Sequence, residues 1–190
     1  MLNTGNQLRL DDLINSFNNT FYQACNVKLI SDGEEPIYLP ADNEVSYNRI
    51  IFTKDYFSSA LHEIAHWCIA GEARRKEIDF GYWYAADGRT SQQQINFENA
   101  EVKPQALEWI FSLYSRQKFN ISSDNLSGGV RHFPEKFARQ VHSQVLLYCE
   151  LGLPTYAEKF RQSLAETFGQ SMELDATLFM YDDLKLSPSR

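Results

Sequence analysis

One segment constrains the fold of this chain more than any other. Between Tyr56 and Ala70 the only formally charged side chain is Glu63. A helix that is apolar on all sides is a buried helix, so the rest of the chain must fold around this segment. We expect the helix to begin at Asp55, as N-cap, and to end at Gly71. The apolar or large residues around Glu63 are Leu61, Ile64, Ala65, Trp67, Cys68 and Ile69.

The remaining segments have the pattern of an α+β domain. Apolar residues at helical spacing predict further helices at Leu8–Cys25, Phe97–Gln117, Pro134–Leu151 and Thr155–Phe168. Runs of β-branched and aromatic residues predict strands at Val27–Ile30, Ile37–Leu39, Arg49–Phe52 and Phe80–Tyr84, with turns at Ser31–Gly33 and Asp87–Gly88. We expect a single domain over residues 1–190, with a small β-sheet, several helices and a frayed tail from about residue 184.

Composition narrows the class of protein. The chain has 190 residues and a formal net charge of −7, which argues against general binding of nucleic acid. Its first residues lack a basic start before an apolar run, and no apolar stretch approaches the roughly 20 residues that span a bilayer. Cys25, Cys68 and Cys149 are odd in number and far apart, which is typical of a reducing compartment. We therefore expect a cytoplasmic protein without a membrane segment.

The buried helix carries a metal-binding motif, His62-Glu63-Ile64-Ala65-His66. Residues four apart on a helix share one face, so two imidazoles at this spacing can meet at one ion. The alternative is a pair of core histidines hydrogen-bonded to backbone, but that reading leaves Glu63 without a role. The sequence therefore predicts a metal site on His62 and His66.

A third protein ligand is expected from the later helix. Glu98 lies on a stripe that is otherwise apolar, with Val102, Ala106, Ile110 and Leu113, whereas Glu101 shares a more polar face. A lone carboxylate on the inward stripe is the better ligand, so helical phase favours Glu98 over Glu101. Pro104 weakens this argument, because it can kink the helix or reset its start.

Other polar residues are weaker candidates. His132 and His142 have no partner at ligand spacing, and each is expected to pack against a helix or face solvent. The run Arg74-Arg75-Lys76 is expected to form a solvated turn, with docking of an acidic partner as the alternative.

Two histidines and a carboxylate with open metal positions serve different chemistries. Zinc on such a site polarises water for hydrolysis, with Glu63 as general base. Iron(II) on the same ligand types is the centre of non-heme oxygenases. A metal-stabilised interaction domain is a further alternative. The motif alone favours a hydrolase, because most H-E-x-x-H proteins are hydrolases.

Four segments resemble the bacterial elongation factor P hydroxylase family. They are SALHEIAHWCIAGEARRKEIDFGYWYAADGR at Ser59–Arg89, FENAEVKPQALEW at Phe97–Trp109, FNISSDNLSG at Phe119–Gly128 and VHSQVLLYCELGLP at Val141–Pro154. The likeness extends from about Leu8 to Phe168, and the combination of HEIAHWCIAG, GYWY and EVKPQAL is its specific part.

The resemblance implies a protein hydroxylase that adds oxygen to the β-lysylated lysine of elongation factor P. It implies a non-heme Fe(II) held by two histidines and a carboxylate, with molecular oxygen as co-substrate and no recognisable cofactor-binding fold. Carried over, the ligands are His62, His66 and the glutamate of the FENAEVKPQ segment, for which helical phase nominates Glu98. In such an enzyme Glu63 would support the metal ligands rather than act as the base.

The amines of such a substrate need acidic partners. Asp79, Asp87 and Glu101 are candidates for the mouth of the site. The aromatic side chains of Tyr82, Trp83 and Tyr84 are candidates for its walls, with ordinary strand packing as the alternative.

Overall fold

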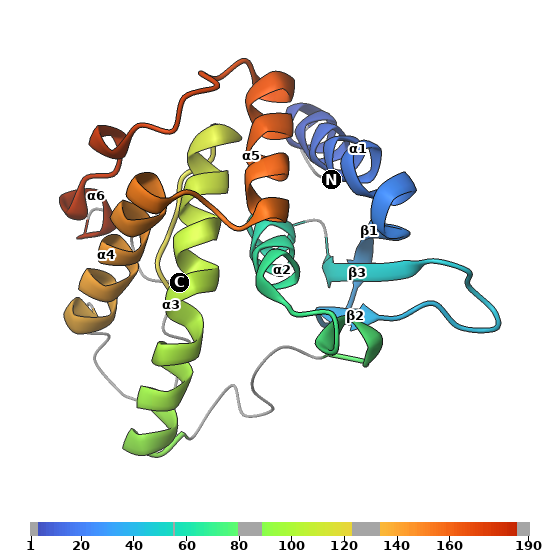
Figure 1. Ribbon diagram of the computed structural model, residues 1–190, viewed down its shortest axis with the longest axis horizontal. Helices are drawn as coiled ribbons and strands as arrows, with labels where there is room; N and C mark the ends of the chain where they lie inside the picture. Colours follow the sequence, from blue (N-terminus) through green and yellow to red (C-terminus); the bar gives the residue numbers. More distant parts are fainter. Residues whose placement is uncertain (1–3, 55, 80–88, 123–133, 186–190) are drawn as a thin grey trace.

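A computed structural model describes the chain except for residues 1–3, 55, 80–88, 123–133 and 186–190. The described residues form an α+β domain, as the sequence predicts (Figure 1). Its helices are α1 (Thr4–Cys25), α2 (Phe57–Ile69), α3 (Ser91–Tyr114), α4 (Glu135–Leu151), α5 (Thr155–Phe168) and the short α6 (Tyr181–Lys185). Two 3-10 turns, η1 (Arg74–Lys76) and η2 (Ala176–Leu178), follow α2 and α5.

The described strands form one three-stranded sheet, β1 (Val27–Gly33), β2 (Ile37–Leu39) and β3 (Asn48–Thr53), in the order β1-β3-β2. β3 is parallel to β1 and antiparallel to β2. A further pair of backbone hydrogen bonds joins Tyr38 of β2 to Asp79, at 2.7 and 3.1 Å. This pair holds the segment after η1 against the edge of the sheet.

The core is built around aromatic rings on three helices. α1 buries a stripe at helical spacing, which includes Leu13, Phe17 and Phe21. Phe17 and Phe21 pack edge-on against Trp67 of α2, with ring centroids 5.5 and 4.9 Å apart. Phe160 of α5 lies 5.6 Å from Phe17. The rings therefore fix α2 against α1 and α5.

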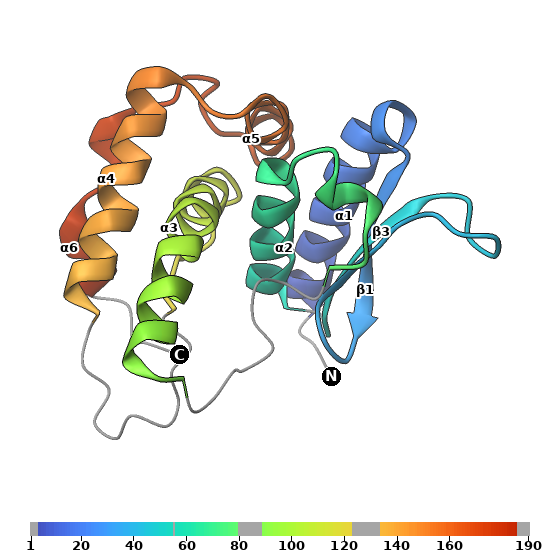
Figure 2. The same ribbon diagram turned by 60° about the horizontal axis from the view of Figure 1, so that its bottom comes forward.

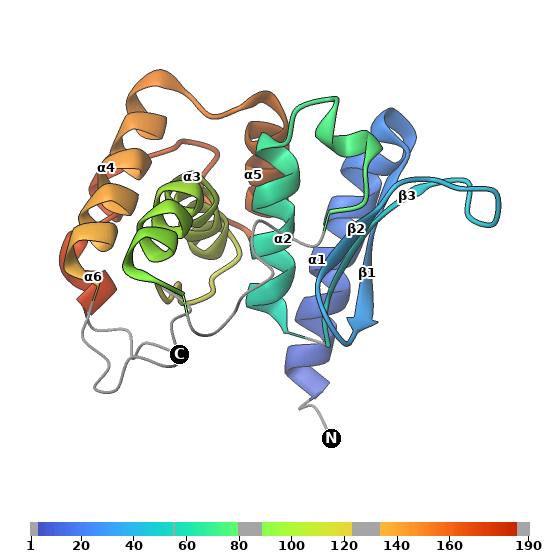
Figure 3. The same ribbon diagram turned by 90° about the horizontal axis from the view of Figure 1, so that it is seen from below.

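Helix α2 lies at the centre of the molecule. It packs against α3, α5 and β3, which cover it on different sides. Figures 2 and 3 show α2 between α3 on one flank and α1 with the sheet on the other. The prediction that this apolar helix is buried is confirmed: Ala60, Leu61, Ile64, Ala65, Trp67 and Cys68 are all buried.

Most predicted boundaries agree with the structure to within a few residues, and three were wrong. α3 begins at Ser91 rather than Phe97, because Thr90 and Gln93 form a capping box there. Ser31–Gly33 continues β1 instead of turning. The predicted strand at Phe80–Tyr84 and the turn at Asp87–Gly88 lie outside the described residues. The predicted N-cap Asp55 was wrong, because α2 begins at Phe57 with Tyr56 as its N-cap.

Within the described part of the chain, none of the helices combines the length and hydropathy that a membrane span requires.

Candidate metal centre

Three side chains from two helices converge at the interface between α2 and α3. His62 and His66 project from α2, and their Nε2 atoms lie 3.0 Å apart. Glu101 of α3 faces both imidazoles, with Oε1 3.2 Å from His66 Nε2 and Oε2 3.5 Å from His62 Nε2. These three residues form the group within the described chain that could hold a metal ion.

The spacing of these ligand atoms suits a metal ion. Metal bonds of about 2.1 Å place two ligand atoms about 3.0 Å apart at a right angle and about 3.4 Å apart at the tetrahedral angle. Oε2 of Glu101 is also buried and has no hydrogen-bond partner among the described residues. A buried carboxylate oxygen without a partner is unfavourable, and a cation at this point would satisfy it.

Glu108 fixes the orientation of His62. Its Oε2 lies 2.8 Å from His62 Nδ1, which donates the hydrogen bond. When Nε2 loses its proton, the proton on Nδ1 is kept by Glu108, and the lone pair of Nε2 is directed toward His66 and Glu101. A carboxylate bonded to the far nitrogen of a ligating histidine is the usual support of a metal ligand.

The carboxylates also shift the protonation of the site. Burial disfavours the charged form of His62, but the charges of Glu101 and Glu108 outweigh it and raise the pKa of His62 to about 10. Burial raises the pKa of Glu101, yet the charge of His62 and the hydrogen bond from His66 lower it to about 2. In the metal-free protein at neutral pH, His62 is therefore a cation paired with ionised Glu101.

This geometry favours Glu101 over Glu98 as the third ligand, whereas helical phase favoured Glu98. Glu98 is half-buried and accepts a hydrogen bond of 3.1 Å from Gln94 of the same helix. Glu101 is 3% exposed and lies between the imidazoles. Of the two alternatives, the structure brings Glu101, not Glu98, to His62 and His66.

The physical reason is that α3 is buried on more than one side. The polar stripe of α3, with Glu101, Gln105, Glu108 and Ser112, is fully buried and includes both groups that face the histidines. The argument from helical phase assumed that the apolar stripe alone faces inward. The role of Glu108 was missed for the same reason, although the helical spacing of Glu101, Gln105, Glu108 and Ser112 placed Glu108 on the same face as Glu101.

A pocket of about 210 Å³ opens beside His66. Glu63 lines it, together with Asp79, which was expected at the mouth of the site. Asp79 is paired with Arg74, with Arg74 Nη2 3.0 Å from Asp79 Oδ1. The other lining residues are Tyr38, Ile50, Trp67, Ile69, Ala70, Gly71, Arg74, Arg75, Ala100 and Pro104.

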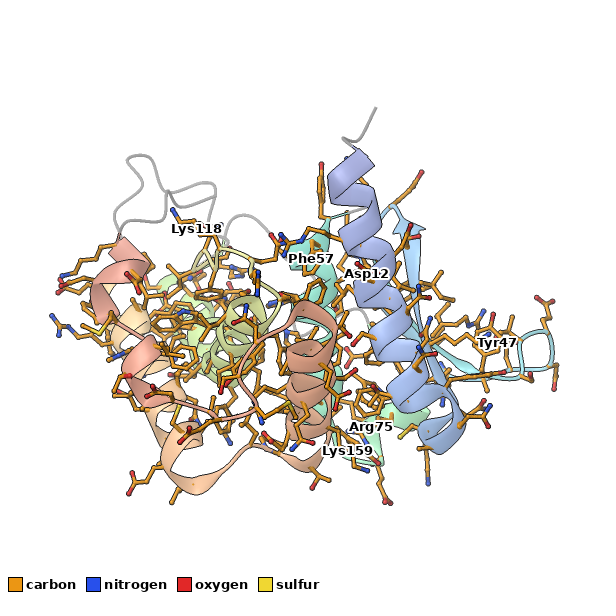
Figure 4. All side chains as sticks on the ribbon, turned by 90° about the horizontal axis from the view of Figure 1, so that it is seen from above. Asp12, Tyr47, Phe57, Arg75, Lys118 and Lys159 are labelled. Carbon is orange, nitrogen blue, oxygen red and sulfur yellow. The ribbon has the colours of Figure 1, made fainter. Side chains whose placement is uncertain are left out.

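The basic run after α2 is built into the fold. Arg75 stacks over Trp67 and Tyr156, and donates a hydrogen bond of 2.9 Å to the Trp67 carbonyl. Figure 4 shows Arg75 near the adjacent ends of α1 and α5. Of the run Arg74-Arg75-Lys76, two members therefore have structural contacts, and only the third is left to meet an acidic partner.

The remaining candidate residues lie away from the metal centre or outside the part of the chain that the structure describes. His142 packs on Trp109 and has its Nε2 2.9 Å from the Phe179 carbonyl, as expected of a packing histidine. Five of the candidates lie outside the described residues, namely Tyr82, Trp83, Tyr84, Asp87 and His132.

Known proteins resemble this chain along nearly its whole length. Residues 16–179 match the family described as Elongation factor P hydroxylase. The Elongation factor P lysine hydroxylase of Haemophilus influenzae is 47% identical over 174 residues, which cover 92% of this chain and 96% of that protein.

Removal of a ligand tests the centre directly. We expect His62→Ala, His66→Ala and Glu101→Ala each to weaken binding of a divalent metal by more than about a hundredfold, because each removes one of three ligands. Glu98→Ala is the matched control on the same helix and should bind metal as the unmodified protein does. Elemental analysis after dialysis gives the metal content. Full metal in Glu101→Ala with loss in Glu98→Ala would reverse the assignment.

A milder change tests the support of His62. Glu108→Gln removes the charge that orients Nδ1, so we expect metal affinity to fall about ten- to hundredfold while the ligands stay in place. Isothermal titration of the metal-free protein measures this change. Unaltered affinity would mean that the contact with Glu108 is packing alone.

Metal binding should also release a proton. His62, with its pKa near 10, is cationic in the metal-free protein at pH 7, whereas a metal ligand must be neutral. We expect about one proton to be released per ion, and the apparent affinity to rise about tenfold per pH unit until the pH approaches 10. Glu101, ionised above pH 2, adds none. Titration in buffers of different ionisation enthalpy counts the protons, and no buffer dependence would contradict this prediction.

Proposed function

We propose, since this chain belongs to the elongation factor P hydroxylase family, that it adds one oxygen atom to the β-lysylated lysine of elongation factor P. The observation that carries this proposal is the joint occurrence of the family match with the His62, His66 and Glu101 cluster. Neither alone would name both a reaction and a place for it.

Iron(II) is the metal we propose for the centre. Hydroxylation by molecular oxygen needs a metal that changes oxidation state, and zinc does not. Two histidines and a carboxylate on one side of an ion are the ligand set of non-heme iron oxygenases. When bound, iron(II) would supply oxygen activation. The chain's own contribution is to hold the ligands in position.

The residues around the centre support such a reaction. Ile64, Ala65 and Trp67, which neighbour the two histidines along α2, are buried, so the helix that carries the histidines is packed into the core. Glu108 keeps the proton on Nδ1 of His62, so that Nε2 is available as a ligand. The pocket beside His66 gives a side chain access to the centre from outside.

A narrow pocket also explains a preference for the β-lysylated form. Addition of a β-lysyl group lengthens the lysine arm and adds amine charge. A short arm that docks without reaching the centre reacts slowly, because positioning is worth several powers of ten in rate. We place the reaction in the cytoplasm, where a translation factor is found and where the free cysteines of this chain stay reduced.

The reaction itself is the test. Given iron(II), oxygen and a reductant, the protein should add one oxygen atom to β-lysylated elongation factor P, and at least about a hundredfold more slowly to the unmodified factor. Intact-mass spectrometry of the factor follows the change.

Three controls define the result. An oxygen-free reaction and the His66→Ala variant should give no product, and Glu98→Ala should remain active. No mass gain with protein shown to contain iron would sink the assignment. The alternative, a zinc hydrolase with Glu63 as base, would then lead.

A further inference from the structure

The pocket beside the centre is narrow and largely apolar. Its volume of about 210 Å³ is below the roughly 300–1,000 Å³ of sites for drug-sized ligands, so it suits one unbranched chain. Ile50, Ile69 and the ring of Trp67 supply apolar wall. His66 lines the same space, which brings an occupant close to the proposed metal.

Most polar groups in this pocket already have partners. Arg74 pairs with Asp79, and Arg75 is held by Trp67 and Tyr156. The hydroxyl of Tyr38 donates to the Arg75 carbonyl, at 2.9 Å. These contacts leave little of the lining able to bind a new charged group.

Glu63 is the exception. Among the described residues, no group forms a hydrogen bond or an ion pair with its carboxylate, although the side chain is largely enclosed. The remaining negative charge would be satisfied by a cation from outside.

A second acceptor lies in the wall contributed by α3. Pro104 lies inside this helix, and its nitrogen carries no hydrogen. The carbonyl of Ala100 therefore lacks the donor that normally bonds it from four residues on. Ala100 and Pro104 both line the pocket. The proline thus leaves the carbonyl of a pocket-lining residue without its usual helical donor, and Glu63 lines the same pocket.

We infer that the Glu63 carboxylate and the Ala100 carbonyl hold an ammonium group of the β-lysyl arm, which makes Glu63 a specificity-determining residue. The inference rests on the proposed function for the identity of the arm. A carboxylate and a carbonyl are acceptors only, and an alkylammonium offers three donors with a positive charge. The apolar wall takes the methylene chain. An arm without this ammonium has nothing to pair with Glu63.

Binding without turnover tests the inference. Iron(II)-loaded protein kept free of oxygen is titrated with β-lysylated and with unmodified elongation factor P. Glu63→Gln should weaken binding of the β-lysylated form about ten- to hundredfold, the range for loss of a charged hydrogen bond, and leave the unmodified form unchanged. In turnover, KM should rise more than kcat falls. Equal losses for both forms, or none, would overturn the inference.

Two variants sharpen the result. Pro104→Ala returns an N–H to the Ala100 carbonyl without harm to the helix, and should weaken binding of the β-lysylated form about two- to tenfold at full iron content. Glu77→Gln, the same change at an exposed carboxylate beyond η1, should alter neither form. A kcat effect alone in Glu63→Gln would assign Glu63 to support of the metal ligands instead.

A small probe separates this inference from the proposed function. n-Butylammonium should bind the wild-type protein and compete with the β-lysylated factor. The Glu63→Gln variant should no longer bind it. If no form of the factor is hydroxylated but the probe still depends on Glu63, the cation site stands and the proposed substrate falls. If the factor is hydroxylated and neither ligand depends on Glu63, the cation site falls alone.

Discussion

The contact on which the rest of this structure depends is the charged interface between α2 and α3. Glu101 and Glu108 are buried against His62 and His66, where an uncompensated carboxylate would be strongly unfavourable. Either a proton on His62 or a metal ion supplies the opposing charge. The packing of the central helix against α3 is thus tied to the state of the site, and metal binding should stabilise the whole domain.

The sequence predicted the histidine pair and its buried helix because both follow from local spacing. His62 and His66 are one turn apart, and the segment around them has a single charge, so neither conclusion needed a partner in space. The choice between Glu98 and Glu101 did depend on knowing which element lies next to each face of α3. Periodicity divides a helix into faces but does not say which face is inside when several elements cover it. α3 buries its polar face, so the more polar stripe holds the acidic residues of the site.

Pairing in space also decided which charged residues are available. In sequence, Arg74, Arg75 and Asp79 look alike as exposed charges near the motif. In the fold, the backbone bridge between Tyr38 and Asp79 brings Asp79 to Arg74. Arg75 instead stacks on the rings of Trp67 and Tyr156. Helix positions came from periodicity, whereas the parallel pairing of β1 with β3 and these ion pairs depend on long-range contacts that no local pattern encodes.

The carboxylates around the histidines together carry a negative charge that needs cations to balance it. The charges of Glu101 and Glu108 raise the pKa of Glu63, although burial is the larger cause, and all three carboxylates raise the pKa of His62. A divalent ion at the histidines and one ammonium at Glu63 would together balance them. Local rules are broken at this place, by Pro104 within a helix and by Glu63, which has no hydrogen bond or ion pair among the described residues. Residues that break such rules tend to mark functional sites.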